Sequence, residues 1–128
     1  LLAGESEVTT LKVAISRIDA QDPNVVKVIT NKHNRALYFS RLPIPFDRDG
    51  EGKTLHFKHI GLYGYTREAL ETFHGLPQSP LELSEKLEQL RFLENGIAVY
   101  VAETHYDTVG VDTPEDLERA AALLAAGV

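Results

Sequence analysis

The sequence predicts an α/β fold whose sheet carries an antiparallel hairpin extension. Short runs with apolar side chains at alternate positions, a pattern typical of strands, lie between segments with helix-start signals. Two of these runs, 25–30 and 36–40, are joined by polar turn-forming residues, which indicates a β-hairpin. Strands mixed with helices of this length favour an α/β sheet, and we expect a single domain over residues 1–128.

Composition fits a globular domain with one core, because 43% of the 128 residues are apolar and 25% are charged. There is no apolar run of 18 residues or more and no basic leader, so we expect no membrane span and a cytoplasmic location. The net charge of −6 argues against a nucleic-acid surface, since phosphate binding needs a basic face. Without cysteines, only carboxylates and five histidines remain for metal or acid–base chemistry.

The start of the sequence leaves two alternatives open. The chain begins Leu1-Leu2-Ala3-Gly4 and contains no methionine, so it is either a processed product or part of a longer chain.

The first forty residues carry strand signals interrupted by turns. Residues 1–6 resemble the frayed end of a helix, and the alternating pattern over 9–17 predicts a strand. Residues 19–24, which contain a proline, form a turn or loop. The two strands of the hairpin, 25–30 and 36–40, follow.

The middle of the chain begins with an extended arm. Residues 41–46 contain two prolines, which remove ladder donors and exclude a central strand. A polar loop over 47–53 leads into a strand over 54–65. Gly61 and Gly64 interrupt this strand, and glycine inside a strand indicates a bulge or a close backbone approach.

The clearest helix signal lies in the stretch 76–96. Ser79 is suited to the N-cap and Pro80 to the first helical position, and a capping box with Glu82 is expected. We expect one helix that begins at Pro80, ends at Gly96, and buries a stripe made of Leu83, Leu87 and Leu90. The other elements expected in the second half are a helix over 66–73, a strand over 97–104, a loop over 105–112 and a helix over 113–127.

Glu88 and Gln89 are the first candidate binding residues. Neighbouring helical positions point about 100° apart. The two side chains could therefore hold a polyhydroxyl ligand between a carboxylate and an amide. The alternative is a solvated helix face.

His59 and Tyr63 form the second candidate group. Strand alternation places them on one face with Gly61 between them, which leaves room for a ligand between two polar rings. They could equally be half-buried strand residues satisfied by their neighbours.

Arg41 and Asp112 complete the candidates. Arg41 could bind a carboxylate or phosphate bidentately, or be a surface arginine. Asp112 lies between a loop and a helix start, where ligands of α/β sheets gather, and could bind Mg²⁺ or cap the helix. Thr113 is better placed for capping. The histidine spacings show no zinc motif.

Together these segments resemble the 3-deoxy-manno-octulosonate cytidylyltransferase family, also called CMP-Kdo synthetase. Their order and spacing agree with the second half of that family's pattern. The segments are 25–28, 36–45, 58–65, 79–82, 86–91 and 110–117, which read VVKV, ALYFSRLPIP, KHIGLYGY, SPLE, KLEQLR and GVDTPEDL.

The resemblance implies a Rossmann-like nucleotidyltransferase fold with a mixed sheet, of which this chain is the C-terminal part. It implies a homodimer that transfers CMP from CTP to Kdo, an eight-carbon sugar acid, with Mg²⁺ as cofactor, for lipopolysaccharide biosynthesis. By the same resemblance Asp112 would be a catalytic metal ligand. The sugar-acid pocket would be lined by Arg41, His59, Tyr63, Glu88 and Gln89.

The family's glycine-rich nucleotide-binding loop and its second metal-binding aspartate are absent from this sequence. We therefore expect the chain to be inactive by itself. Two alternatives remain: a cytidylyltransferase for a related sugar acid, such as an amino-substituted octulosonate or a nonulosonate, and a non-catalytic dimerisation fragment.

Overall fold

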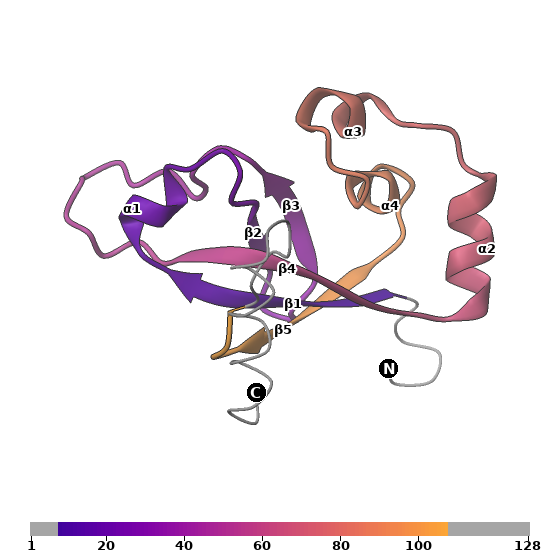
Figure 1. Cartoon of the computed structure of the whole chain (residues 1–128), viewed down its shortest axis with the longest axis horizontal. Helices are drawn as coiled ribbons and strands as arrows, with labels where there is room; N and C mark the ends of the chain where they lie inside the picture. Colours follow the sequence, from indigo (N-terminus) through magenta and orange to yellow (C-terminus); the bar gives the residue numbers. More distant parts are fainter. Residues whose placement is uncertain (1–7, 108–128) are drawn as a thin grey trace, which may run out of the picture.

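The computed structural model describes residues 8–107 as a mixed five-stranded sheet with short helices (Figure 1). The strand order is β3-β2-β4-β1-β5. Among the strand pairs formed within residues 8–107, β1 and β5 are parallel and the others antiparallel, so the predicted α/β sheet with an antiparallel hairpin is confirmed. The elements are β1 (Val8–Ile15), α1 (Arg17–Ala20), β2 (Lys27–Thr30), β3 (Ala36–Ser40), β4 (His56–Tyr65), α2 (Arg67–Gly75), α3 (Pro80–Glu85), α4 (Leu90–Glu94) and β5 (Val99–Thr104).

The β2–β3 hairpin forms as predicted, and its turn is held by Asn31. The Asn31 side-chain oxygen accepts hydrogen bonds from the backbone N–H groups of His33 at 2.8 Å and Arg35 at 3.0 Å. Asn34 takes the left-handed conformation with φ of 64°, which asparagine tolerates better than most residues. These local bonds explain why the turn could be predicted from composition.

Strand β4 contains the predicted irregularity. Thr9 pairs with Gly64 and Leu11 with Ile60, so residues 61–63 face Thr10 alone. The backbone also approaches closely at Gly64, where an added Cβ would lie 2.7 Å from the hydroxyl oxygen of Thr9. Both predicted reasons for glycine in this strand are therefore present.

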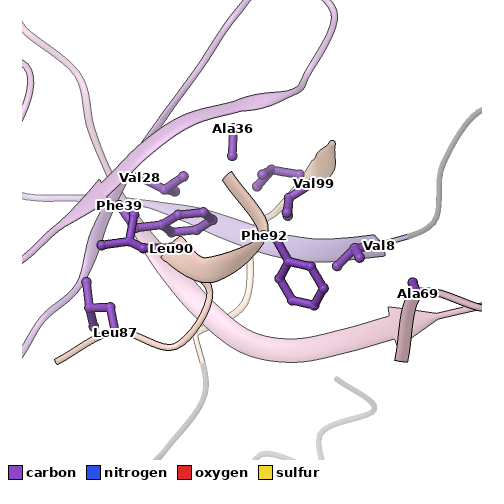
Figure 2. Close-up of a cluster of buried hydrophobic side chains, with 10 residues drawn as sticks. Val8, Val28, Ala36, Phe39, Ala69, Leu87, Leu90, Phe92 and Val99 are labelled. Carbon is purple, nitrogen blue, oxygen red and sulfur yellow. The ribbon is translucent and has the colours of Figure 1, made fainter. Parts of the chain in front are cut away.

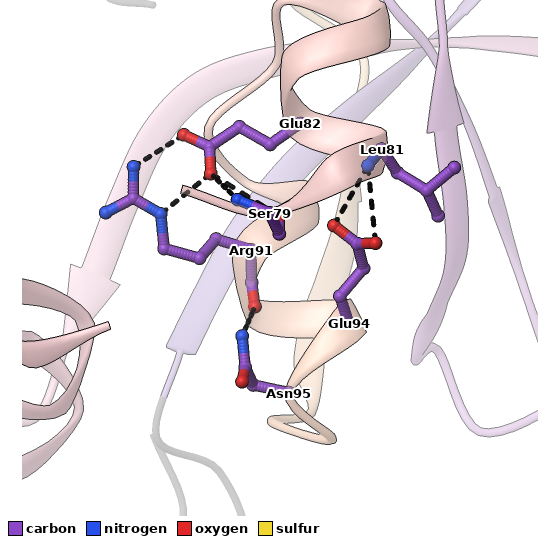
Figure 3. Close-up of polar contacts among 6 residues, drawn as sticks. All are labelled: Ser79, Leu81, Glu82, Arg91, Glu94 and Asn95. Carbon is purple, nitrogen blue, oxygen red and sulfur yellow. Dashed lines mark hydrogen bonds and ion pairs between the residues drawn. The ribbon is translucent and has the colours of Figure 1, made fainter. Parts of the chain in front are cut away.

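The predicted starts of α2 and α3 are confirmed. Thr66 caps α2, because its side chain accepts a hydrogen bond from the backbone N–H of Ala69. Ser79, Pro80 and Glu82 start α3, and the Glu82 carboxylate accepts from the backbone N–H of Ser79 at 3.0 Å (Figure 3).

The prediction of one helix from Pro80 to Gly96 is wrong. Lys86 takes the left-handed conformation with φ of 58° and ends α3, and α4 begins only at Leu90. The leucine stripe is therefore not continuous, because Leu83 is 45% exposed whereas Leu87 and Leu90 are buried. Two short helices, α3 and α4, replace the single helix. Residues 86–89 join them, and we call this segment the 86–89 turn.

Glu82 and Arg91 hold the two short helices together. The Glu82 carboxylate accepts hydrogen bonds from Arg91 Nε at 2.8 Å and Nη2 at 2.5 Å (Figure 3). The Arg91 guanidinium also lies 4.2 Å from the centre of the Phe73 ring in α2. The capping residue of α3 thus fixes the positions of α4 and α2.

The core lies between the sheet and helices α2 and α4, and the 86–89 turn adds Leu87 to it. Figure 1 shows helices α2, α3 and α4 on one side of the sheet, over the end where β4 leads into α2. Phe39 from β3, Phe92 from α4 and Val99 from β5 meet there (Figure 2). The other buried members of this cluster are Val8, Val28, Ala36, Ala69, Leu87, Leu90 and Val101.

Residues 41–46 form no strand, as the prolines predicted, and they expose Leu42 and Phe46. Helix α1 was not predicted. It is capped by Ser16 and begins at Arg17, so the strand expected over 9–17 ends earlier, at Ile15. The helical tail expected over 1–6, the helix expected over 113–127 and Asp112 lie outside the described residues.

Candidate functional site

A pocket of about 400 Å³ opens between the end of β4, helix α2 and the 86–89 turn. Three of the residues proposed from the sequence, Tyr63, Glu88 and Gln89, line it together. The remaining lining residues are Tyr65, Leu70, Phe73, His74, Lys86, Leu87 and Phe92. Aromatic walls with a few polar groups are typical of small-molecule sites.

His59 lies behind this pocket and is 8% exposed. Its Nδ1 atom is 3.4 Å from the side-chain nitrogen of Gln89, and its ring lies 5.4 Å from that of Tyr63. Burial lowers the pKa of His59 to about 4, so the ring is neutral at pH 7. His59 therefore supports pocket residues from behind and does not act as a cation.

Tyr63 connects His59 to the aromatic wall of the pocket. Its ring stacks on Tyr65 with centres 5.5 Å apart, and Tyr65 in turn lies 6.0 Å from Phe92. Burial, with smaller contributions from Tyr65 and Glu88, raises the pKa of the Tyr63 hydroxyl well above its ordinary value of 10. The hydroxyl therefore keeps its proton at neutral pH and can donate a hydrogen bond.

Glu88 and Gln89 lie in the 86–89 turn and not inside a helix. Glu88 is exposed, whereas Gln89 is 9% exposed and contacts His59. The predicted proximity of a carboxylate and an amide at one pocket is therefore present, although the geometry that produces it is a helix break.

Arg41 lies beside the same turn but is not among the residues that line the pocket. Its guanidinium donates hydrogen bonds to the backbone carbonyls of Glu85 at 2.7 Å, Pro23 at 3.1 Å and Lys86 at 3.2 Å. The bonds to Glu85 and Lys86 satisfy carbonyls where α3 ends, and the bond to Pro23 ties this end to the loop before β2. Arg41 therefore fixes the 86–89 turn.

Sequence reasoning did not single out Lys86, which lines the pocket, or Thr10, which contacts His59 behind it. Lys86 lines the pocket from the left-handed end of α3, and neither glycine nor proline marked that break. Thr10 is buried on β1, and its hydroxyl oxygen lies 2.9 Å from His59 Nε2. The only signal for Thr10 was the pair of glycines in the strand opposite it.

The described residues do not by themselves provide a metal site. Within residues 8–107, no three histidine or carboxylate side chains lie close enough together to hold an ion. Asp112, the predicted Mg²⁺ ligand, lies outside this range. No helix in the same range is long and apolar enough to cross a membrane.

The mixed sheet and its helices define an α/β fold of the nucleotidyltransferase type, and comparison with known proteins identifies the family. Residues 2–119 match the family model described as Cytidylyltransferase. The chain therefore belongs to the cytidylyltransferase family, which confirms the resemblance noted in the sequence.

Individual relatives are more specific. The chain is 55% identical over 118 residues to a 3-deoxy-manno-octulosonate cytidylyltransferase of Koribacter versatilis, covering 92% of this chain and 45% of that protein. It is 58% identical over 107 residues to the enzyme of that name from Solibacter usitatus, covering 84% of this chain and 42% of that protein. The chain thus spans less than half the length of either relative.

A solved structure supports the same relationship. The structure of CMP:2-keto-3-deoxy-manno-octonic acid synthetase complexed with CTP is similar with a TM-score of 0.87 and 43% sequence identity. The similarity covers 98% of this chain and 52% of that one. This chain therefore corresponds to about half of the longer chain in that structure.

Proposed function

We propose that the intact protein transfers CMP from CTP to 3-deoxy-D-manno-octulosonate (Kdo), and that this chain supplies the sugar-acid pocket. The pocket where Tyr63, Glu88 and Gln89 meet carries this proposal, because it combines a hydroxyl donor, a carboxylate and an amide on an aromatic wall. A polyhydroxyl ligand needs such a mixture of donors and acceptors. The family and the names of the relatives supply the reaction class.

In this reaction the anomeric hydroxyl of the sugar acid attacks the α-phosphorus of CTP and loses its proton, while pyrophosphate leaves. Catalysis of such a transfer depends on positioning and on neutralisation of phosphate charge, and we assign no covalent intermediate. Glu88 and Gln89 would bind sugar hydroxyls, and Tyr63 would donate to a sugar oxygen. Neutral His59 would hold Gln89 in place without adding charge.

The nucleotide-binding part of the active site would lie outside the described residues. We assign this chain to the C-terminal part of the catalytic domain, with the nucleotide-binding loop in the other part. Mg²⁺, held in part by Asp112, would supply charge neutralisation at the phosphates when bound. The intact protein would be a cytoplasmic homodimer that serves lipopolysaccharide biosynthesis.

Pyrophosphate release by the purified intact protein tests the proposal. With CTP and Mg²⁺, Kdo should give turnover and a CMP-sugar product, and its kcat/KM should exceed that of an 8-amino analogue or a nonulosonate. A higher kcat/KM for one of those acids would make that acid, and not Kdo, the substrate. Absence of CMP transfer to any of them would show that the protein is not this kind of enzyme.

A further inference from the structure

The hydroxyl group of Thr10 is surrounded by three polar atoms of β4. It lies 2.9 Å from His59 Nε2, 3.0 Å from the carbonyl oxygen of Ile60 and 2.9 Å from the carbonyl oxygen of Leu62. The bulge over residues 61–63 places these groups around a single side chain of β1. Thr10 is 2% exposed, so these three atoms are the partners that its buried hydroxyl has among the described residues.

Counting protons determines the state of His59. A threonine hydroxyl has one proton and two lone pairs, and carbonyl oxygens only accept. The hydroxyl therefore gives its proton to one carbonyl and accepts a proton from His59 Nε2. A hydroxyl that instead donated to Nε2 would leave both carbonyl oxygens facing its lone pairs at hydrogen-bond distance, whereas donation to a carbonyl leaves only one of them so. The neutral imidazole must then carry its proton on Nε2 and a lone pair on Nδ1.

This tautomer determines the orientation of the Gln89 amide. Only the NH₂ group of the amide can donate to the Nδ1 lone pair, and this nitrogen lies 3.4 Å from Nδ1. The opposite orientation would place two acceptors against each other. The amide oxygen of Gln89 is consequently left as an acceptor at the pocket that Gln89 lines.

We propose that Thr10 is a positioning residue of the sugar-acid pocket, which acts through His59 to present the Gln89 carbonyl oxygen to a hydroxyl of the ligand. The three residues come from β1, β4 and the 86–89 turn, so the contact chain also fixes that turn against the sheet. Phe39 restrains the His59 ring further, since it meets the ring edge to face with centres 4.8 Å apart. The kinetic part of this inference rests on the proposed function.

The tautomer can be measured in the intact wild-type protein without any change at Thr10. Long-range ¹H–¹⁵N correlation spectra of ¹⁵N-histidine-labelled protein distinguish Nε2–H from Nδ1–H, and the His59 signals are those missing from His59→Gln. We expect the neutral Nε2–H form at pH 7. A neutral Nδ1–H form or an imidazolium would overturn the proposal.

Two substitutions then separate the hydroxyl from the shape of the side chain. Thr10→Val removes the hydroxyl, and we expect mixed His59 tautomers and a KM for Kdo raised about tenfold, with kcat and the KM for CTP within about twofold. Thr10→Ser keeps the hydroxyl and should stay within about twofold of wild type in each quantity.

The remaining outcomes also decide the question. An unchanged KM for Kdo in Thr10→Val, or a serine variant as impaired as the valine variant, would overturn the positioning role. If Thr10→Val does not fold, the wild-type tautomer and the serine variant decide. If the wild-type protein does not transfer CMP to Kdo, the proposed function fails, and the tautomer spectra alone decide whether Thr10 orients His59.

Discussion

Arg91 covers the buried carboxylate of Glu82 with two charge-assisted hydrogen bonds, and this pair joins the start of α3 to α4. Glu82 is 3% exposed. The hydrogen bonds from Arg91 outweigh the effect of burial and lower the pKa of Glu82 below its ordinary value of 4.5. Without the Arg91 guanidinium, this buried carboxylate would keep, within residues 8–107, only the hydrogen bonds from Ser79 and no opposite charge in contact.

Arg91→Met should lower the free energy of unfolding by about 3 kcal/mol at pH 7, because it leaves a buried charge without its partner. The pKa of Glu82 is lowered in the folded state, so the stabilisation is present above pH 4.5 and is lost as pH falls through the lowered value. Denaturant unfolding at several pH values should therefore show the difference from wild type shrinking below pH 4.5.

The exposed pair of Lys53 and Glu51 provides the control. Both side chains are more than half exposed, and Lys53→Met should change the unfolding free energy by no more than about 0.5 kcal/mol. Equal effects of the two substitutions would contradict the assignment of a structural role to the Glu82–Arg91 pair.

His59 should make stability depend on pH. Its pKa is lowered by burial from 6.5 to about 4, so the unfolded chain binds the proton more tightly in this interval. The stabilisation is complete above pH 6.5 and falls by roughly 3 kcal/mol as pH drops toward 4. His59→Gln should remove this part of the pH dependence in denaturant unfolding. A His59 signal that titrates near pH 6.5 in the folded protein would refute the prediction.

Arg41→Lys tests whether Arg41 fixes the 86–89 turn. Lysine keeps the charge but cannot reach the carbonyls of Pro23, Glu85 and Lys86 together, so we expect a loss of about 2 kcal/mol in unfolding free energy. The control Arg17→Lys, at an exposed residue, should change it by about 0.5 kcal/mol or less. Unchanged stability with a raised KM for Kdo would instead support the direct sugar-acid contact implied by the family resemblance.

The arm over residues 41–46 should contribute to a homodimer. It exposes Leu42 by 69% and Phe46 by 83%, and apolar groups on an extended segment favour association. Phe46→Glu should shift the intact protein from dimer to monomer in sedimentation velocity at micromolar concentration. Leu70→Glu, at a 40% exposed position on α2, serves as the control and should leave the dimer intact. A wild-type monomer would remove this prediction.

Sequence signals predicted those features whose causes are local. The hairpin turn is built from Asn31 and Asn34, and the start of α3 from Ser79, Pro80 and Glu82, so their hydrogen bonds connect residues close together in the chain. The break at Lys86 could not be predicted in this way. Its carbonyl and that of Glu85 are held by Arg41, which lies more than forty residues earlier.

The same limit applies to the site. Tyr63, Glu88 and Gln89 could be selected as polar residues beside glycine or on a helix, but the role of Thr10 depends on a bulge in another strand. Gln89 also differs from the expectation that it lies on a helix surface, since it is buried against His59. Glu88 is therefore the better probe of ligand binding, because it lines the pocket and is exposed.

Calorimetric binding of Kdo to the intact Glu88→Ala protein shows whether this pocket binds the sugar acid. We expect the Kdo affinity to fall at least about tenfold, while the CTP affinity stays within about twofold of wild type and the unfolding free energy within about 0.5 kcal/mol. Glu71→Ala, at an exposed glutamate of α2 that does not line the pocket, should change none of these quantities. Unchanged Kdo affinity in Glu88→Ala, or equal losses for Kdo and CTP, would contradict the assignment of this pocket to the sugar acid.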